Sequence, residues 1–545
     1  MATHEVTNQP PPLVDYNLFD ADLPLRESLE REGGSWAQDL VSELGRLAGS
    51  EEAIAWGFQA NSNAPQLHTH DRFGDRIDEV EFHPAWHRLM EVAIGHGLHA
   101  LPWRDPRPGA HVARAAAFYV WSQVEGGHGC PVSMTYAAVP ALRRQPELAE
   151  RWEPVITSLE YDPGLRPPAS KRGALIGMAM TEKQGGSDVR ANTTRAVPVG
   201  AGGPGGEHLL TGHKWFCSAP MCDAFLVLAQ APGGLSCFLL PRVLDDGTRN
   251  GFQIQRLKDK LGNRSNASSE IELDEAWAVM IGEEGRGVRT IIEMVNHTRL
   301  DCVIGSASLM RQAVAQATHH TAHRSAFGRL LSEQPLMVNV LADIAVESEA
   351  TILLMMRLAG AFDRASDESE AAFKRLALAV AKYWTCKRAI GVVAEALECH
   401  GGNGYVEESI MPRLYRDAPL NSIWEGSGNV NALDVLRAMK REPESLLAFL
   451  EEVQQAGGID PRFDDFVRKL EARLADGDEA EARARSIVEL MAVALEASLL
   501  IRHGDPAVAD AFCASRLDSN GGRSFGTLPP STNLAGIVER HRPQI

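Results

Sequence analysis

Long apolar runs are missing from this 545-residue sequence. The most apolar stretch, residues 486–501, contains Glu489 and Glu496 and is shorter than the roughly 20 residues of a membrane-spanning helix. Residues 1–12 are polar and rich in proline, without the basic start and apolar middle of a secretory signal. These absences predict a cytoplasmic protein with an N-terminal arm or a frayed end.

Closely paired cysteines are also missing. The eight cysteines form no Cys-x-x-Cys motif, which favours reduced thiols over a disulfide framework. His68, His70 and Asp71, and also His83 with His87, have spacings compatible with a metal. Neither a cysteine pair nor a His-Glu-x-x-His frame accompanies them, so we expect surface or interface histidines and no metal.

Positive charge is in deficit, because 54 Lys and Arg stand against 72 Asp and Glu and give a net charge of −18. This balance opposes nonspecific attraction to phosphate backbones and anionic lipids. The segment from residue 440 onward has 13 basic and 18 acidic residues, so it is not a basic domain. Its basic residues either belong to a mixed-charge surface, which we favour, or gather on one face. The candidates for such a face are Arg437, Lys440, Arg441, Arg483, Arg485, Arg540 and Arg542.

The remaining composition is that of a globular protein. Hydrophobic residues make up 44% of the chain and charged residues 23%, and the length predicts three or four packed units. Between residues 24 and 172, apolar residues recur at helical spacing. From 181 to 274 the pattern changes to short β-rich runs, with residues 200–206 as a hairpin connection. We therefore predict a small β-barrel or sandwich between two helical blocks.

Long helical segments return after Gly287. Residues 291–320 and 371–398 have helical spacing, and Leu336, Val340 and Ile344 are predicted to form a buried stripe. With the segment after Glu425 they predict a four-helix bundle, followed by further helices from residue 460. The predicted fold is thus mainly α-helical with a central β-domain. The predicted domains are an N-terminal arm and helical domain (1–180), a β-domain (181–285), a helical bundle (286–440) and an additional C-terminal helical domain (441–545).

A glutamate in front of an apolar helical segment is the most informative local feature. Glu425 lies between Trp424 and Gly426, after residues 421–423, which are predicted to be extended. A rigidly held carboxylate, beside a bulky ring and a glycine that permits close approach of a ligand, is what a general base needs. The alternative is a surface glutamate that compensates a helix dipole.

The helix behind Glu425 has its own signals. Ser427 and Asn429 are residue types that cap helices. The predicted buried face of this helix consists of Val430, Leu433 and Leu436.

Five other segments accompany this glutamate. Residues 178–188 combine a threonine, paired glycines and a serine on a predicted turn, and residues 212–218 are a predicted strand with two adjacent rings. Three motifs follow at 260–268, at 323–328 (His-Arg-Ser-Ala-Phe-Gly) and at 400–405 (His-Gly-Gly-Asn-Gly-Tyr). In this order the set resembles the flavin-dependent acyl-CoA dehydrogenase family, from about residue 84 to 439. It resembles especially a bacterial branch connected with the response to alkylation.

The resemblance implies an FAD enzyme that oxidises acyl-CoA thioesters. Glu425 is implied as the base that removes the α-proton while the β-hydride leaves for flavin N5. Phe216 is implied beside the flavin, Ser218 near N5, and Thr181 and Ser187 at the flavin and its diphosphate. The other positions implied at the cofactor are Met178, Met180, Cys217, Ile423, Trp424, Ser427 and Asn429.

The resemblance also implies an oligomer. By the family pattern Arg-x-x-Phe-Gly, Arg324 reaches the FAD diphosphate of a neighbouring subunit, with Phe327 packed nearby. The glycines implied at the adenine end are Gly401, Gly402 and Gly404. A cofactor that bridges subunits implies a homotetramer, built as a dimer of dimers.

Some positions depart from the family pattern. Arg299 and Trp424 are implied at the acyl-CoA channel, but Trp424 stands where tyrosine is commoner, and its larger ring is expected to narrow the channel. Lys183 stands where many relatives have proline, and Ala219 where asparagine is frequent. Flavin binding is still expected, whereas efficient turnover of ordinary CoA thioesters stays open.

Three functions remain. The first, which we favour, is a flavoprotein of the alkylation-response branch with weak dehydrogenase activity on a substrate like isovaleryl-CoA. It would associate with double-stranded DNA through Arg437, Lys440 and Arg441. The second is a metabolic dehydrogenase of short or branched acyl-CoA without a DNA role. The third is a flavin-stabilised structural or binding protein without turnover.

Overall fold

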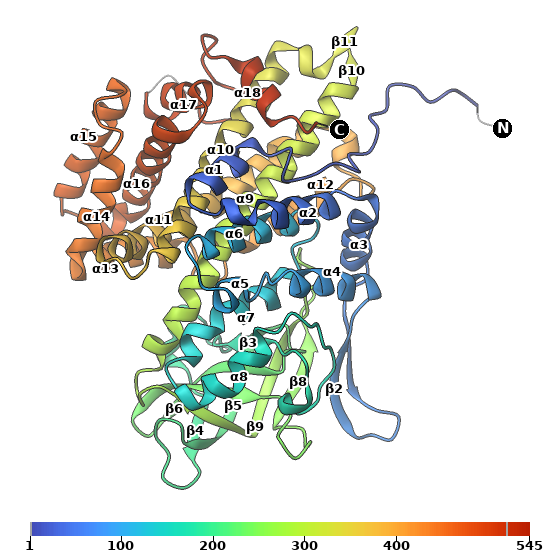
Figure 1. Cartoon of the computed structure of the whole chain (residues 1–545), viewed down its shortest axis with the longest axis vertical. Coiled ribbons are helices and arrows are strands. Elements are labelled where there is room, and N and C mark those ends of the chain that lie inside the picture. Colours follow the sequence, from blue (N-terminus) through green and yellow to red (C-terminus); the bar gives the residue numbers. More distant parts are fainter. Residues whose placement is uncertain (1–2, 519–521, 545) are drawn as a thin grey trace. The chain divides into compact units, whose positions relative to one another are not determined.

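The computed structural model describes residues 3–518 and 522–544, which form two compact units (Figure 1). Unit 1 comprises residues 1–54, 108–124 and 302–545, and unit 2 comprises residues 55–107 and 125–301, apart from the undescribed positions. Helices α3 (Glu51–Ser62) and α9 (Gly287–His323) each begin in one unit and end in the other. The finer division into four domains stays a prediction.

Unit 2 is built around a sheet that closes on itself. The strands are β3 (Ile176–Ala179), β4 (Arg195–Pro198), β5 (Glu207–Ser218), β6 (Ala224–Ala231), β7 (Gly234–Pro241), β8 (Phe252–Leu257) and β9 (Ser268–Ile281). Pairing runs in the order β3-β6-β4-β5-β9-β7, and β7 also pairs with β6, which closes a barrel. Strands β6 and β7 are almost wholly buried, because they carry apolar residues on both faces. The predicted β-barrel between helical blocks is confirmed.

Helices and a hairpin complete unit 2. The helices are α4 (Pro84–Gly95), α5 (Leu101–Arg104), α7 (Gly129–Leu142), α8 (Pro146–Ile156) and the beginning of α9. The hairpin consists of β1 (Gln66–His70) and β2 (Arg76–Glu81), within the segment predicted to be helical. That part of the prediction is wrong. Neither strand buries a continuous apolar face, so the periodicity of apolar residues gave no strand signal.

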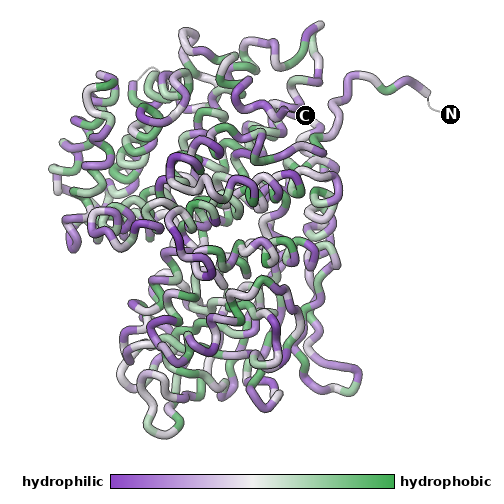
Figure 2. The backbone as a smooth tube through the Cα atoms, in the orientation of Figure 1, coloured by the Kyte–Doolittle hydropathy of each residue, from purple (hydrophilic) through white to green (hydrophobic). Residues whose placement is uncertain are grey.

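Unit 1 is helical. Its helices are α1 (Leu23–Arg31), α2 (Gln38–Ala48), α6 (Ala110–Ser122), the end of α9, α10 (Pro335–Asp363), α11 (Glu368–Cys399), α12 (Met411–Asp417), α13 (Gly428–Arg441), α14 (Pro443–Gln454), α15 (Pro461–Ala475), α16 (Ala480–His503), α17 (Pro506–Phe512) and α18 (Leu534–His541). Hydrophobic and hydrophilic residues alternate around their turns, as Figure 2 shows. The long helices predicted at 291–320 and 371–398 are confirmed as α9 and α11.

The predicted stripe on α10 is wrong at its first position. Leu336 is exposed and Val340 is only partly covered, whereas Ile344 is fully buried. The first turn of α10 lies at the surface, and continuous burial starts at Leu341. Helical spacing located the helix but not the turn at which it enters the core.

The helices after residue 441 pack onto the bundle of unit 1. Helix α16 contacts α10, α11 and α13, and α18 contacts α10. Glu349 on α10 accepts hydrogen bonds from Arg540 and His541 on α18, at 2.9 Å each. The additional C-terminal helices are therefore present, and buried charged contacts attach them to α10. Arg540, paired with Glu349 and Glu27, does not belong to an open basic face.

The described residues contain neither a membrane-spanning helix nor a disulfide. Across the described ranges, no helix combines the length and apolarity required to span a membrane. No disulfide joins the eight cysteines, and all of them are buried.

Candidate functional site

Glu425 lies in a strained turn immediately before α13. Its φ is +57°, in the left-handed region that residues with a side chain seldom adopt, and Gly426 follows with φ +99°. Residues 420–422 form a short 3-10 turn, so the predicted extended entry at 421–423 is wrong. Such strain costs on the order of 1 kcal/mol and persists only where neighbours fix the backbone, often at functional sites.

Lys382 on α11 fixes this turn. Its ammonium donates to the carbonyl oxygens of Trp424 at 2.8 Å and Gly426 at 2.6 Å, one on each side of Glu425. The side chain is buried, with an exposed fraction of 1% for the residue. Asn431 donates a further hydrogen bond to the Gly426 carbonyl at 2.6 Å. The peptides that flank Glu425 are thus held from the core of unit 1.

Replacing Lys382 with Met keeps the buried aliphatic stem but removes both hydrogen bonds. Because the Trp424 and Gly426 carbonyls lose a charged donor, we expect the free energy of unfolding to fall by about 2–3 kcal/mol. Urea denaturation measures this, with the exposed Lys440→Met as the matched control. Equal stability of the two variants would show that Lys382 does not hold the turn.

The helix predicted after Glu425 is present as α13, which begins at Gly428, but its details differ from the prediction. Ser427 is the N-cap residue by backbone position, yet its side chain makes no capping hydrogen bond. Asn429 accepts a hydrogen bond from Arg485 on α16 at 2.8 Å. The predicted buried face is wrong, since Leu433 is exposed. The face that is buried instead carries Asn431, Ala432, Val435 and Ala438.

In unit 2, the segment at 178–188 folds into the predicted turn. Met178 is buried on β3, while Thr181 is half-buried and Ser187 is exposed. The amide of Gly185 donates to the Glu182 carbonyl at 3.0 Å, and a side chain on Gly186 would clash with the Thr181 hydroxyl. The paired glycines therefore let this turn fold tightly against Thr181.

Glu182 anchors this turn, a role that the sequence did not reveal. Its carboxylate is fully buried and lies 2.8 Å from the Lys214 ammonium on β5. It also accepts hydrogen bonds from the hydroxyls of Thr193 and Thr194, at 2.9 and 2.6 Å. Burial raises the pKa of Glu182, but Lys214 and these hydrogen bonds outweigh it and hold the pKa well below its ordinary value.

Strand β5 presents the predicted flavin residues next to that turn. The Trp215 amide donates to the Thr181 carbonyl at 2.8 Å, which joins the two segments. Phe216 is 53% exposed, an open aromatic face on the barrel, and the Lys258 ammonium lies 4.6 Å from its ring centre. Ser218 is half-buried, with its hydroxyl 3.3 Å from that of Ser268.

Cys217 lies between Phe216 and Ser218 on β5, and its side chain points to the opposite, buried face of the strand. Its thiol is fully buried, and burial raises its pKa to about 12. A ligand beside Phe216 could therefore meet only the backbone of Cys217. Unit 2 thus brings Met178, Met180, Thr181, Phe216 and Ser218 into one region, with Ser187 on the exposed part of the turn.

In unit 1, a small hairpin follows α9 and carries Arg324 and Phe327. Strands β10 (Ser325–Ala326) and β11 (Arg329–Leu330) flank Phe327, which has φ +54° and an exposed fraction of 98%. The Arg324 guanidinium donates to the carbonyl of Asn8 at 2.5 Å. This apolar ring at the tip of the hairpin is thus almost wholly exposed.

The glycine-rich turn after α11 lies near this hairpin. Residue Asn8 contacts Ser325, and the adjacent Gln9 accepts from Asn403 at 3.3 Å, so the N-terminal arm bridges the hairpin and the turn. Space above Gly401 and Gly402 is open. Glycine is required at position 404 for a different reason, because a side chain there would clash with the Leu397 carbonyl.

The other predicted residues are dispersed. Arg299 is buried on α9, in the part that belongs to unit 2. Ile423 is exposed and Trp424 half-buried, and the Trp424 indole donates to Asn421 at 3.1 Å. Arg437, Lys440 and Arg441 are exposed on α13.

The remaining basic residues of the proposed face have acidic or polar partners. Arg483 pairs with Asp476, and Arg542 pairs with Glu539. Arg437 itself lies 3.6 Å from Asp434. These contacts support the mixed-charge interpretation of the C-terminal surface.

The histidines singled out by their spacing have ordinary partners. His68 pairs with Glu81, His83 caps α4 and His87 contacts Tyr161. Throughout the described residues, no group of three or more His, Cys, Asp or Glu side chains is placed to hold a metal.

Family models match three successive parts of the chain. Residues 8–163 match the Adaptive response protein AidB N-terminal domain, residues 177–276 the acyl-CoA dehydrogenase middle domain, and residues 285–440 the acyl-CoA dehydrogenase C-terminal domain. The first match covers the arm, the N-terminal helices and the hairpin β1–β2.

Individual relatives agree with these matches over nearly the whole chain. The putative acyl-CoA dehydrogenase AidB of Escherichia coli is 46% identical over 522 residues, which cover 95% of each protein. The acyl-CoA dehydrogenase family member 11 of Caenorhabditis elegans is 33% identical over 82% of this chain and 74% of that protein. The crystal structure of C. elegans ACDH-11 in complex with C11-CoA has a TM-score of 0.84 at 28% identity, covering 99% of this chain and 93% of that one. The chain therefore belongs to the acyl-CoA dehydrogenase family, and within it to the AidB type.

Proposed function

We propose that this protein is an FAD-dependent acyl-CoA dehydrogenase of the AidB type that acts in the cytoplasm. In this proposal, the Glu425 carboxylate takes the α-proton of a bound acyl-CoA thioester. When bound, FAD supplies the acceptor for the β-hydride. The proton stays on Glu425 until it is released to water, which restores the base.

The observation that carries this proposal is the turn at Glu425. A general base must be held at a fixed position, and the chain keeps this glutamate in a strained backbone conformation. The buried Lys382 holds the carbonyls on both sides of it. A glutamate that only compensated the dipole of α13 would need neither the strain nor the buried lysine.

The residues proposed for FAD fit a flavin by their exposure. Phe216 offers an open aromatic face, and the turn at Thr181 presents hydroxyl and amide groups next to it. Arg324 supplies a guanidinium suited to a diphosphate, and Gly401 and Gly402 leave space for an adenine ring. Ser187, on the exposed part of its turn, suits a phosphate contact.

A short or branched acyl chain is the proposed substrate class. Trp424 occupies the position before the base, with its indole hydrogen-bonded to Asn421, so its ring is held in place. A fixed indole beside Glu425 leaves less room than the commoner tyrosine, which favours a compact group such as isovaleryl. Arg299 is proposed to face the same channel.

The test is the absorption spectrum of the purified protein, recorded anaerobically during titration with a panel of CoA thioesters that includes isovaleryl-CoA. Bleaching of a flavin band by short or branched thioesters supports the proposal. An intact flavin spectrum that no thioester changes would favour the flavin-stabilised binding protein instead. A colourless protein that takes up no FAD would contradict both the dehydrogenase and the flavin-stabilised binding protein.

A homotetramer is part of the proposal. Phe327, Leu336 and Tyr405 are large, strongly exposed apolar residues, and two of them adjoin the segments proposed to hold FAD. We expect sedimentation analysis to give four times the chain mass of 59.3 kDa. Replacing Phe327 with Ser should weaken the assembly, whereas a monomeric wild-type protein that retains FAD would contradict a cofactor shared between subunits.

Association with double-stranded DNA also belongs to the proposal, through Arg437, Lys440 and Arg441. These residues are exposed together near the end of α13, although the chain as a whole is strongly acidic. Binding that rests on phosphate contacts should weaken steeply with added salt, and Arg437→Ala should reduce that slope by about one. A fluorescence titration at low salt that detects no binding would remove the DNA role and leave a metabolic dehydrogenase.

A further inference from the structure

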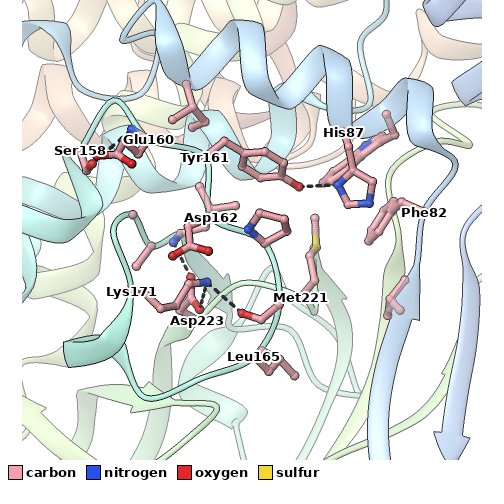
Figure 3. A pocket seen from close by; sticks show the side chains of 18 of the residues that line it. Phe82, His87, Ser158, Glu160, Tyr161, Asp162, Leu165, Lys171, Met221 and Asp223 are labelled. Carbon is pink, nitrogen blue, oxygen red and sulfur yellow. Dashed lines mark hydrogen bonds and ion pairs between the residues drawn. The ribbon is translucent and has the colours of Figure 1, made fainter.

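A cavity of ≈130 Å³ lies in unit 2 (Figure 3). Its walls come from the end of β2, the helix α4, the segment around residues 158–165 and the beginning of the barrel. Met178, Thr181, Phe216, Ser218 and Arg299 are not among the described residues that line it. The lining of this space therefore includes none of these residues of the site proposed above.

One side of the cavity is aromatic and apolar. The rings of Phe82 and Trp86 stack with centroids 3.9 Å apart at an interplanar angle of 20°. Met221 and Leu165 also line the cavity and add apolar surface (Figure 3). A void of this size resembles an engineered apolar cavity of roughly 150 Å³ that takes up benzene.

Two residues that line the cavity each carry a buried polar atom without a partner within the described chain. The Trp86 indole N–H is one, and the residue is 1% exposed. The other is Oδ1 of Asp78, a residue that is 5% exposed and whose Oδ2 accepts from Arg76 at 2.7 Å. A buried donor or acceptor without a partner costs about 1–3 kcal/mol, so such atoms are rare unless a ligand or water meets them.

A neutral hydrogen-bonding pair lies beside these rings, since the His87 ring contacts both Phe82 and Trp86. Nδ1 of His87 lies 2.8 Å from the Tyr161 hydroxyl. Burial lowers the pKa of His87, and burial also raises the pKa of Tyr161. Both side chains are therefore uncharged at neutral pH. They can form hydrogen bonds with a bound ligand as neutral groups.

The charges around the cavity disfavour an anion. Lys171 is the only Lys or Arg among the described lining residues, and it lies 2.6 Å from Asp223, so the pair contributes no net charge. The other charged lining residues are the acids Asp78, Glu79, Glu160 and Asp162. Each of these four acids has an arginine partner outside the lining, Arg76, Arg249, Arg172 and Arg166 respectively. The described lining residues therefore offer no unpaired positive charge that could bind a phosphate or a carboxylate.

We propose that this cavity binds one neutral, ring-sized aromatic molecule that carries a hydroxyl group, such as a phenol. The ring packs against Phe82 and Trp86. The hydroxyl accepts the hydrogen bond of the Trp86 indole and donates its own to Asp78, because a hydroxyl can do both. This binding does not depend on flavin.

The test is isothermal titration of the full-length protein with phenol, toluene and benzoate. We expect phenol to bind more tightly than toluene and benzoate not to bind. Trp86→Phe keeps a stacked ring but removes the N–H, so phenol affinity should fall about tenfold while toluene affinity is unchanged. Leu165→Trp, on a half-buried loop position, fills the space and should abolish binding of both.

Several outcomes would overturn this proposal. One is failure of phenol and toluene to bind at millimolar concentration, which would mean that only water occupies the cavity. Another is binding of benzoate above phenol, and a third is phenol binding that Leu165→Trp leaves intact. If Trp86→Phe fails to fold, the proposal is still tested by the comparison of the three ligands with the wild-type protein and by Leu165→Trp.

Discussion

Exchange of Glu425 for Gln is expected to slow bleaching of the flavin by an acyl-CoA at least about 100-fold, the usual contribution of a positioned general base. The amide has nearly the same shape as the carboxylate but cannot take the α-proton. Because the Trp424 and Gly426 carbonyls are held by Lys382, the turn should keep its conformation in the variant. Stopped-flow absorbance under anaerobic conditions measures the rate.

The matched control is Glu408→Gln, at an exposed glutamate of the neighbouring loop. This variant should bleach at the wild-type rate. Both variants should retain the flavin band, which separates loss of the base from loss of the cofactor. Wild-type bleaching by Glu425→Gln would mean that another group removes the proton.

The second large effect concerns the buried pair of Glu182 and Lys214. In Glu182→Gln the Lys214 ammonium stays buried without its counter-charge, so the free energy of unfolding at pH 7 should fall by about 3–5 kcal/mol. Urea denaturation gives this value, with the exposed Glu272→Gln on β9 as the control. The turn that holds Thr181 should loosen as well, with weaker retention of FAD.

The pH dependence of this pair has a definite sign. The folded-state pKa of Glu182 lies below its ordinary value of 4.5, so its stabilising contribution is complete above pH 4.5 and declines as pH falls below that value. The stability difference between wild type and Glu182→Gln should therefore narrow in acid. Adding Lys214→Met should recover part of the lost stability, because an apolar partner needs no counter-charge. A difference that widened in acid would contradict this account.

The fold could be predicted where apolar residues recur at regular spacing along a long stretch of the sequence. Helices α9 and α11 and most of the barrel strands have such patterns and were located from them, whereas β3 and β8 were not. The hairpin β1–β2 was missed because neither strand buries a continuous apolar face. Leu336 was wrongly predicted to be buried, because periodicity identifies the apolar face of a helix but not which of its turns are covered by other elements.

The site was less accessible to sequence reasoning. The chemistry proposed for Glu425 could be inferred from its neighbours and from resemblance to a family. Lys382 and Glu182 could not, because Lys382 contacts carbonyls 42 and 44 positions away and Glu182 pairs with Lys214, 32 positions away. A lysine within a helical run and a glutamate in a turn ordinarily indicate solvated surface. Only the fold shows that both are buried and that each fixes a turn.

The most direct test of the central claim is a crystal structure of the protein with FAD and a non-reactive acyl-CoA analogue. The account predicts that the Glu425 carboxylate faces the isoalloxazine ring across a gap filled by the acyl chain, next to the α-carbon. A Glu425 side chain remote from the ring, or FAD bound away from Phe216 and Thr181, would contradict it.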